Sequence, residues 1–224
     1  MTVKILVTGV GGQGTITSIK LICQAAKLEG HKVIAREIHG MAQRGGSVNA
    51  SVVIGGSSSA MIGKGDADLV IATEPLELLR NMHLISRKSV AVVCMDKVIP
   101  FSIRGNESDY PTTDSLIRTI ISNAGSLFYI NEANIYSMHQ FKKSLNIYIL
   151  GVAVRSGALP VSRDSFIRVI NEYFKPDVAS INLKLFESGY ALEMVDTISQ
   201  NKDDFEYLNP ANYEYLLEQE TMTG

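Results

Sequence analysis

Short apolar runs alternate with amphipathic stretches along the first part of the chain. The apolar runs are read as strands and cover residues 3–7, 33–36, 69–72, 89–95 and 126–130. After the first run, Ile19, Ile22, Cys23 and Ala26 fall on one face of a helical pattern. This alternation predicts the α/β class, with a Rossmann-like and mostly parallel sheet. We expect the first two strands to lie side by side and parallel.

A strand pattern follows the second strand, where a Rossmann half would continue into a helix. Residues 47–54 read as a strand, residues 55–59 as a polar turn, and residues 60–62 as a second short strand. The sequence therefore predicts a β-hairpin over residues 47–62 that makes the sheet mixed.

The C-terminal part of the chain is predicted to be mainly helical. A short helix is expected at residues 115–122, and longer ones at residues 145–156, 163–174 and 178–198. We divide the chain into one domain, residues 1–198, and an acidic C-terminal extension, residues 199–224. Residues 201–224 hold one Lys against six Asp or Glu, with Tyr, Phe and Leu interleaved.

Composition narrows the classes of function. The 224 residues are 46% hydrophobic, which is enough to bury the core of one large domain. The formal charge is -2 and no Lys/Arg stripe appears, so nucleic acid is not an expected partner. No apolar run approaches the roughly 20 residues that span a bilayer, and no signal-peptide pattern opens the chain. We expect no membrane association and a cytoplasmic location.

The two cysteines, Cys23 and Cys94, read as small core residues. An iron-sulfur cluster takes about four cysteine thiolates, and a structural zinc site takes four Cys or His ligands at short spacing. Neither pattern occurs, so we expect no metal in this chain. His31, His83 and His139 read as surface or capping residues.

A glycine-rich turn follows the first strand: Gly9-Val10-Gly11-Gly12-Gln13-Gly14. Gly9, Gly11 and Gly14 match a G-x-G-x-x-G turn, in which backbone approaches a ligand and the next helix favours negative charge. Glu37 lies about 20 residues further on, as in a site for a nicotinamide cofactor. Alternatively, the glycines only form a tight turn against neighbouring backbone.

A second polar loop, His39-Gly40-Met41-Ala42-Gln43-Arg44-Gly45-Gly46-Ser47, follows the second strand. Arg44 could bind a phosphate or carboxylate, and Gln43 and His39 could form hydrogen bonds. If the two strands are parallel, both loops emerge at the carboxyl edge of the sheet, where α/β proteins bind ligands. The loop could instead stabilise its own fold or contact a neighbouring subunit.

The glycine turn and the run Glu37-Ile38-His39-Gly40-Met41-Ala42-Gln43-Arg44-Gly45-Gly46-Ser47-Val48 together resemble the gamma-type domain of 2-oxoacid:ferredoxin oxidoreductases. Further matches are Ala72-Thr73-Glu74-Pro75, Pro100, Tyr110-Pro111, Asn146, Leu150-Gly151, and Asn182 through Phe186 to Gly189-Tyr190. The resemblance covers most of residues 1–195. Within the family, the chain is most similar to the small subunit of the indolepyruvate type, followed by the gamma subunits of the pyruvate and 2-oxoisovalerate types.

The resemblance implies a subunit that is inactive alone and carries no catalytic residue. Thiamine diphosphate, Mg²⁺ and iron-sulfur clusters are expected on a large partner subunit, with ferredoxin as the electron acceptor of the complex and coenzyme A as co-substrate. This chain would complete the active-site wall or the acyl-acceptor channel. The residues implied to lie near anionic groups are Gly9, Gly11, Gly12, Gln13, Gly14, His39, Gln43, Arg44, Gly45 and Gly46. Asp96 departs from the family, which often has asparagine there.

Two alternatives remain open from the residues themselves. The chain could be a stand-alone NAD(P)-binding reductase that uses Gly9, Gly11, Gly14 and Glu37. It could also be a non-catalytic assembly module that holds a partner with the same surface.

Overall fold

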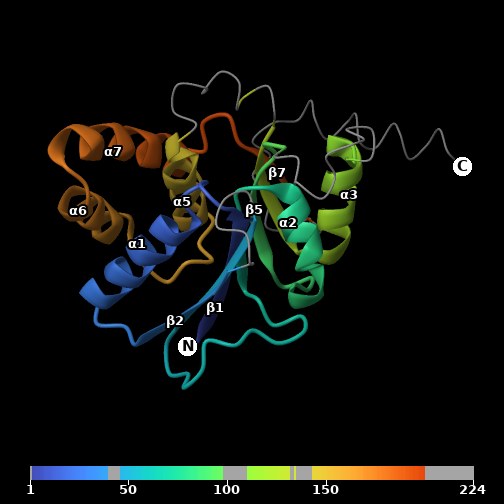
Figure 1. The fold of residues 1–224 in the computed structure, drawn as a ribbon, viewed down its shortest axis with the longest axis horizontal. Helices are drawn as coiled ribbons and strands as arrows, with labels where there is room; N and C mark the ends of the chain where they lie inside the picture. Colours follow the sequence, from blue (N-terminus) through green and yellow to red (C-terminus); the bar gives the residue numbers. More distant parts are fainter. Residues whose placement is uncertain (1, 40–45, 98–109, 132–133, 135–142, 200–224) are drawn as a thin grey trace, which may run out of the picture.

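A computed structural model describes residues 2–39, 46–97, 110–131, 134 and 143–199, without the side chains of residues 38 and 39. A seven-stranded sheet has the order β2-β3-β1-β4-β5-β6-β7 (Figure 1). Its strands are β1 (Val3–Val10), β2 (Val33–His39), β3 (Ser47–Ile54), β4 (Leu69–Ala72), β5 (Val90–Cys94), β6 (Ser126–Ile130) and β7 (Asp196–Ser199). The helices are α1 (Thr15–Leu28), α2 (Pro75–Arg80), the 3-10 helix η1 (Met82–Leu84), α3 (Thr113–Asn123), α5 (Leu145–Arg155), α6 (Arg163–Tyr173) and α7 (Pro176–Tyr190).

The centre of the sheet is parallel. β1, β4, β5 and β6 pair in parallel succession, and β3 and β7 run the opposite way. β2 pairs antiparallel with β3 and so runs in the same direction as β1. The predicted α/β class, with a Rossmann-like and mostly parallel sheet, is confirmed.

The predicted partners of the second and third strands were wrong. β3 lies between β1 and β2, so the two strands expected side by side are separated by one strand. The hairpin is β2–β3, and residues 60–62 form no strand. Ala50, Val52 and Ile54 are buried, which is the condition of a strand with neighbours on both sides and a helix on one face. The apolar pattern identified β3 as a strand but not its neighbours.

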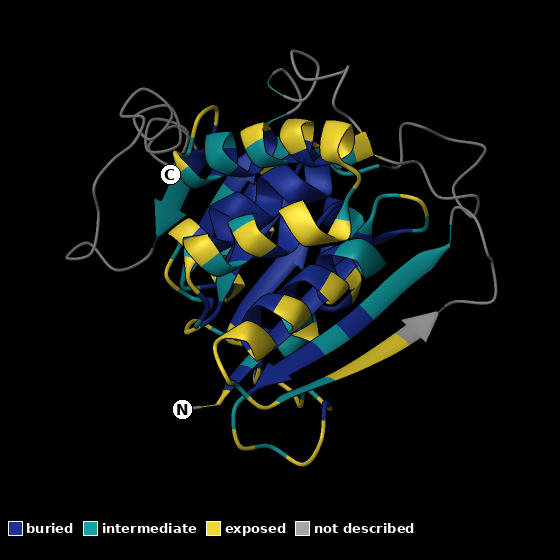
Figure 2. Cartoon of the chain, turned by 90° about the vertical axis from the view of Figure 1, so that its left-hand side faces the viewer, coloured by how far each residue is buried: buried dark blue, intermediate teal, exposed yellow. Residues whose placement is uncertain are grey.

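Two helical layers cover the sheet (Figures 1 and 2). Ile5 and Val7 point into the larger core, shared with α1, α5, α6 and α7. Leu6 points the other way, into the core shared with α2 and α3. Each such side chain contributes about 1.5–3 kcal/mol by leaving water, so the alternation along β1 determines its orientation in the sheet.

Helices α5 and α7 are in backbone contact at two glycines. A Cβ at Gly151 would lie 2.1 Å from the carbonyl oxygen of Phe186, and a Cβ at Gly189 would lie 2.1 Å from that of Tyr148. No other residue type fits these positions without separating the helices. The close contact fixes α5, which carries part of the site described below.

The predicted helix at residues 178–198 was wrong at its C-terminal end. α7 ends at Tyr190, and Leu192 and Met194 take positive φ values of 58° and 59°. Residues 196–199 then form β7, which pairs antiparallel with β6, and the Asn131 amide donates to Asp196 Oδ2 over 3.1 Å. Because residues 200–224 lie outside the described residues, the division of the chain at residue 198 stays a prediction.

The longest helices of the described ranges, α1 and α7, have 14 and 15 residues. In this part of the chain, no helix combines the length and apolarity needed to cross a membrane.

Candidate functional site

A pocket lies where the direction of the chain connections reverses across the sheet. After β1 the chain enters α1 on one face, and after the adjacent β4 it enters α2 on the other face. In open α/β sheets, ligands bind in the crevice at such a point, outside the carboxyl ends of the strands. The pocket has a volume of about 160 Å³. Its lining consists of Gly12, Gln13, Thr73, Cys94, Asp96, Lys143, Leu145, Asn146 and Ile149.

Close packing accounts for two glycines of the predicted turn. A Cβ at Gly9 would lie 1.8 Å from Thr73 Oγ1. Gly14 has φ +80°, and a Cβ there would lie 2.6 Å from the side-chain carbon of Asn146. The Asn146 amide also donates to the Gly14 carbonyl over 3.2 Å. The tight-turn alternative therefore explains Gly9 and Gly14, and a ligand contact by either stays a prediction.

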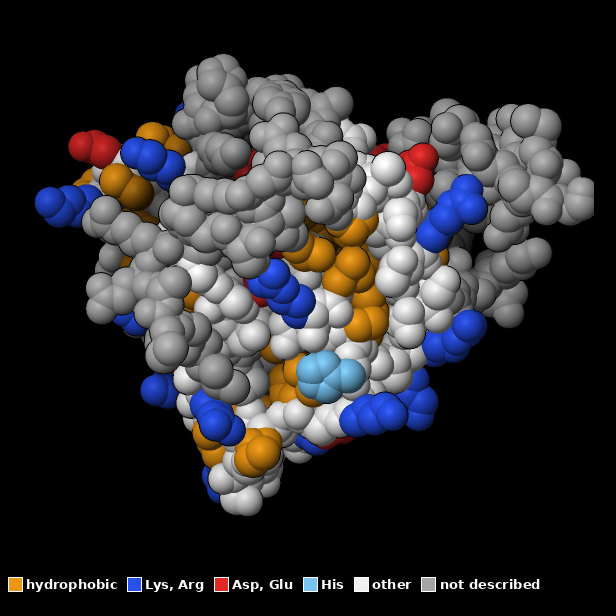
Figure 3. Space-filling view, turned by 45° about the vertical axis from the view of Figure 1, so that its right-hand side comes forward, with side chains coloured by type: hydrophobic (Ala, Val, Ile, Leu, Met, Phe, Trp, Pro, Cys, Tyr) orange, Lys and Arg blue, Asp and Glu red, His pale blue; other side chains and the backbone are white. Residues whose placement is uncertain are grey.

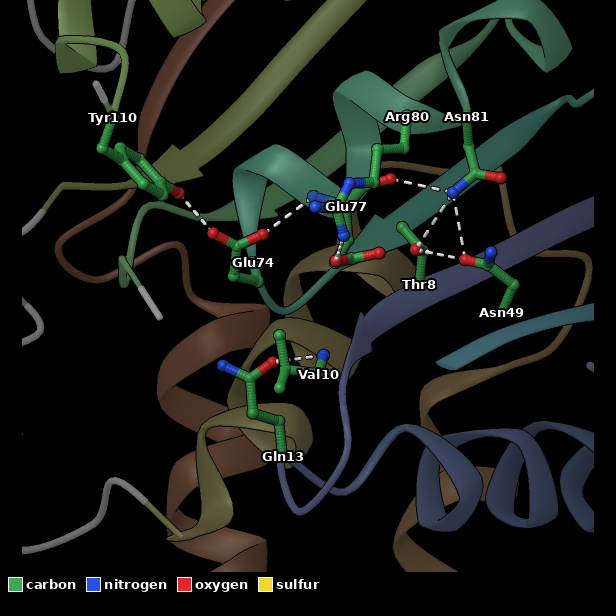
Figure 4. Close-up of polar contacts among 9 residues, drawn as sticks. All are labelled: Thr8, Val10, Gln13, Asn49, Glu74, Glu77, Arg80, Asn81 and Tyr110. Atoms are coloured by element: carbon green, nitrogen blue, oxygen red, sulfur yellow. Dashed lines mark hydrogen bonds and ion pairs between the residues drawn. The ribbon is translucent and has the colours of Figure 1, made fainter. Parts of the chain in front are cut away.

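Gln13 turns back into the protein and joins the ends of β1 and β4. Its Oε1 accepts from the Val10 backbone N–H over 2.8 Å (Figure 4). The same oxygen accepts from Thr73 Oγ1, also over 2.8 Å. Its Nε2 donates to the Thr73 carbonyl over 3.2 Å. Gly12 stays exposed, with φ +101° and nothing within 4 Å of a Cβ built there. Gly12 is thus the glycine of the turn at which a ligand can approach the backbone.

The second polar loop meets this turn at its C-terminal end. The Gly11 backbone N–H donates to the Gly46 carbonyl over 2.9 Å. Gln43, Arg44 and Gly45 lie outside the described residues, as does the side chain of His39 at the end of β2. Their roles stay predictions, but both loops do emerge at one edge of the sheet.

The charges and dipoles around the pocket suit a small polar group with a negative charge. α1 begins at Thr15, has no acidic residue in its first turn, and presents the positive end of its dipole here. Thr15 is buried, and its Oγ1 has no hydrogen-bond partner within the described ranges. Lys143 supplies a cation, Asp96 an anion, and Leu145 and Ile149 an apolar wall.

A buried carboxyl group follows Thr73 directly. Glu74 is fully buried at the N-cap of α2, where one oxygen accepts from Tyr110 Oη and the other accepts from the Glu77 backbone N–H over 2.8 Å (Figure 4). Burial raises the pKa of the Glu74 carboxyl, and these hydrogen bonds lower it by less. Sequence reasoning did not assign Glu74 a role. The sequence signal that could have identified it is an acidic residue directly before Pro75, which is typical of a helix N-cap.

A second polar group, also missed from the sequence, joins three elements on the face of the sheet that α2 covers. Thr8 Oγ1 donates to Asn49 Oδ1 over 2.6 Å, and Asn81 Nδ2 donates to the same oxygen over 3.0 Å (Figure 4). These contacts join β1, β3 and the end of α2. Because Thr8 and Asn81 are buried, the satisfied hydrogen bonds specify how these elements align.

The geometry does not bring Glu37 to the glycine turn, as a nicotinamide site would require. Glu37 is paired with Ala50 of β3, and Ala50 is paired with Val7 of β1. Glu37 therefore lies two strand spacings, about 10 Å, from β1, level with Val7 rather than with the strand end. In a dinucleotide site, the acid lies on the strand next to β1.

The cysteines and the other titratable groups form no metal centre in the part of the chain that the structure describes, where no three His, Cys, Asp or Glu residues are grouped to hold an ion. Cys94 is buried beneath the pocket, and Cys23 is partly buried on α1. Burial raises the pKa of the Cys23 thiol, as expected for a packing residue rather than a nucleophile.

The fold and the pocket define a doubly wound α/β domain with a candidate site at the carboxyl edge of its sheet. Residues 4–192 match the family model described as pyruvate ferredoxin/flavodoxin oxidoreductase, and the chain belongs to that family. The predicted family resemblance is confirmed.

Curated relatives agree with the predicted branch of the family. The indolepyruvate oxidoreductase subunit IorB of Methanothermobacter thermautotrophicus is 35% identical over 190 residues, which are 85% of this chain and 97% of that protein. The subunit of the same name from Archaeoglobus fulgidus is 32% identical over 85% of this chain and 94% of its own length.

Solved structures show the same fold. Pyruvate oxidoreductase subunit PORC from Thermotoga maritima has a TM-score of 0.65 at 21% identity, over 88% of this chain and 98% of its own. The 2-oxoglutarate:ferredoxin oxidoreductase of Magnetococcus marinus, solved with 2-oxoglutarate, coenzyme A and succinyl-CoA bound, has a TM-score of 0.64 at 21% identity. That similarity covers 93% of this chain and 32% of the other, so one fold unit here matches part of a longer chain.

Proposed function

We propose that this chain is the small subunit of a 2-oxoacid:ferredoxin oxidoreductase of the indolepyruvate type. In this proposal, thiamine diphosphate with Mg²⁺ on a large partner subunit carries out oxidative decarboxylation to an acyl-CoA. Iron-sulfur clusters of that partner pass electrons to ferredoxin. The curated relatives support the branch, and the cysteine count supports a partner for the redox chemistry. The expected cytoplasmic location stays a prediction.

The observation that carries the proposal is the pocket between the ends of β1 and β4. It offers Gly12, the α1 N-terminus and Lys143 to an anionic group, and Leu145 and Ile149 to an apolar one. Coenzyme A combines phosphates with a largely uncharged pantetheine arm, so its chemistry fits this donor set. A volume of about 160 Å³ holds only part of that molecule. The partner subunit would supply the rest of the site.

Each side chain has a distinct role in this proposal. Lys143 and the first N–H groups of α1 hold a phosphate or the developing negative charge of an acyl group. Gln13 keeps the turn closed from inside, so Gly12 presents bare backbone to the ligand. His39, Gln43, Arg44 and Gly45 are proposed to close the site from the second loop, whose end is bound to Gly11 through Gly46.

Co-expression with the large subunit tests the function. We expect the two chains to purify together, and 2-oxoacid- and coenzyme A-dependent dye reduction to require both, with indolepyruvate preferred over pyruvate and 2-oxoisovalerate. Full activity of the large subunit alone would contradict the proposal. Saturable NADH binding by this chain alone, followed by fluorescence, would favour the stand-alone reductase instead.

Substitutions in the assembled complex test the site. Lys143→Ala should raise the KM for coenzyme A about fivefold or more, as expected for loss of one charge-assisted contact, and should leave subunit association unchanged. Lys88→Ala, at an exposed lysine before β5, is the matched control. Arg44→Ala separates the assembly alternative: a scaffold would lose association, whereas a ligand site would assemble and lose turnover.

A further inference from the structure

A second groove lies on the face of the sheet opposite to the one that α1 covers. It has a volume of about 260 Å³ and runs over β1, β2 and β3, between the segment 60–62 and η1. Figure 3 shows the side of the molecule that carries α2 and α3, where hydrophobic side chains gather across the middle of the face with Lys and Arg around them. This groove shares no lining residue with the pocket described above, and it has no part in the proposed function.

The walls of the groove are held in place by hydrogen bonds. Ser51 Oγ donates to the Ala60 carbonyl and fixes the segment 60–62 over β3. On the opposite side, Asn81 donates to Asn49 and positions the start of η1. The groove is therefore a built feature of the fold and not a gap between loosely packed loops.

The lining is both apolar and cationic. Met61 is 67% exposed, the largest value among the exposed large hydrophobic side chains of the described chain, and Ile62 and Leu84 extend its surface. Arg36 and His83 also line the groove, and its described lining contains no Asp or Glu. The Arg36 side chain makes no hydrogen bond or ion pair with any residue that the structure describes. Such a surface is complementary to a segment with aromatic or aliphatic side chains and carboxylates.

This chain carries a segment of that kind beyond the family domain. The family match ends at residue 192, and the relative at 35% identity is matched over 97% of its own length but only 85% of this chain. The remaining C-terminal residues include Tyr213-Glu214-Tyr215-Leu216-Leu217-Glu218-Gln219-Glu220. Two aromatic, two aliphatic and three acidic residues thus lie within eight positions.

Chain length determines which part of the extension can reach the groove. Ser199, the last residue of β7, lies in one row across the sheet with Ser126, Val90, Leu69, Ile5 and Val52. Five strand spacings separate β7 from β3, about 24 Å, and the path must also pass around α2 and α3. Asp203 is four residues beyond Ser199 and reaches at most about 14 Å, whereas Tyr213 is fourteen residues beyond and reaches up to about 48 Å.

We propose that residues 213–220 of this chain dock in the groove. Their aromatic and aliphatic side chains cover Met61, Ile62 and Leu84, and their carboxylates face Arg36 and His83. The extension thereby shields an exposed apolar surface on the same chain. The alternative occupant, a face of the large subunit, is distinguished by the test.

An indole placed in the groove reports on docking in the full-length chain. The chain has no Trp, so Met61→Trp introduces one fluorophore at a position exposed enough to accept it. We expect blue-shifted emission and weak quenching by acrylamide. Tyr215→Ser, Leu216→Ser and Leu217→Ser together should shift the emission to longer wavelength and increase quenching. Phe205→Ser, six residues beyond Ser199 and able to reach only about 21 Å, should change neither the emission nor the quenching.

Charge reversal tests the orientation of the segment. Arg36→Glu should lower the docked-to-free ratio about tenfold, and combining it with Glu214→Lys, Glu218→Lys and Glu220→Lys should restore docking. Lys20→Glu, on the opposite face in α1, is the control and should have no effect. Two results would overturn the proposal: emission that is insensitive to the extension, or shielding that appears only with the large subunit and without regard to residues 213–220.

Discussion

Gly11 donates its backbone N–H to the carbonyl oxygen of Gly46 over 2.9 Å, and this bond joins two loops that are far apart in the sequence. The first loop leaves β1, and the second precedes β3, which is paired with β1 along its whole length. The antiparallel pairing of Val10 with Ser47 places these loop ends side by side. A hairpin strand, rather than a parallel neighbour, therefore brings the second loop to the glycine turn.

The first prediction concerns Gly14. Gly14→Ala should lower the free energy of unfolding by about 2–4 kcal/mol, because a left-handed residue with a Cβ costs about 1–2 kcal/mol and the Cβ would also meet the buried Asn146 amide. Urea unfolding of the isolated chain measures this. Gly12→Ala has a positive φ but open space, so its loss should be about half as large. Equal losses for the two variants would show that Asn146 does not restrict this position.

The second prediction concerns the contact between α5 and α7. Gly151→Ala should destabilise the chain by about 3 kcal/mol or more, because the new Cβ would lie 2.1 Å from a helix carbonyl and the two helices must separate. Gly63→Ala is the matched control, since its Cβ would be at an ordinary 3.7 Å from Asp66, and it should change stability by less than about 0.5 kcal/mol. A change at Gly151 as small as that at Gly63 would contradict the close contact.

The third prediction concerns the pH dependence that Glu74 causes. Burial raises the pKa of this carboxyl above its usual 4.5, so the folded state binds the proton more tightly than the unfolded state. This contribution to stability is fully present below pH about 4.5 and is lost as the pH rises through the raised folded-state pKa. Glu74→Gln keeps a neutral acceptor for Tyr110. Its stability relative to the wild type should therefore increase as the pH rises across that window.

A second variant makes the Glu74 test specific. Tyr110→Phe removes a hydrogen bond that lowers the pKa of Glu74, so the window should move to higher pH. Urea unfolding measured at several pH values from acid to neutral would decide, and parallel stability curves for Glu74→Gln and the wild type would argue against a raised pKa.

The spacing of apolar residues along the sequence was sufficient to predict the strands and helices that bury one face at regular intervals. The apolar run of β1, the amphipathic face of α1 and the short helix α3 all lie where their side-chain spacing placed them. The glycine turn was also placed correctly, because a strand followed by a helix puts the connecting turn at the carboxyl edge. These features depend only on residues that are close together in the sequence, so they can be predicted without knowing the tertiary contacts.

Features that depend on contacts between residues far apart in the sequence could not be predicted from this spacing. The apolar pattern of β3 shows that one face of the strand is buried but not that β1 and β2 are its neighbours. β7 has only four residues, and the left-handed Leu192 and Met194 before it leave no trace in an apolar pattern that also fits a helix. Gly9 and Gly14 matched a ligand-binding spacing, yet Thr73 and Asn146 occupy the space beside them.

The last prediction tests whether Thr73 positions the glycine turn. Thr73→Val keeps the shape of the side chain but removes the hydroxyl that donates to Gln13 Oε1 over 2.8 Å, so the isolated chain should lose about 1–2 kcal/mol of stability. Combined with Gln13→Ala, the loss should be less than additive by about 1 kcal/mol, because both variants break one contact. Thr119→Val, at an exposed hydroxyl on α3, is the control and should change stability by less than about 0.5 kcal/mol.

The kinetic effect of the same variant separates a binding role from a structural one. In the assembled enzyme, Thr73→Val should raise the KM for coenzyme A more than it lowers kcat, because the turn loses its fixed position but no reacting group is removed. An unchanged KM together with lower stability would leave Thr73 a structural residue only, and would contradict a role of the turn in binding.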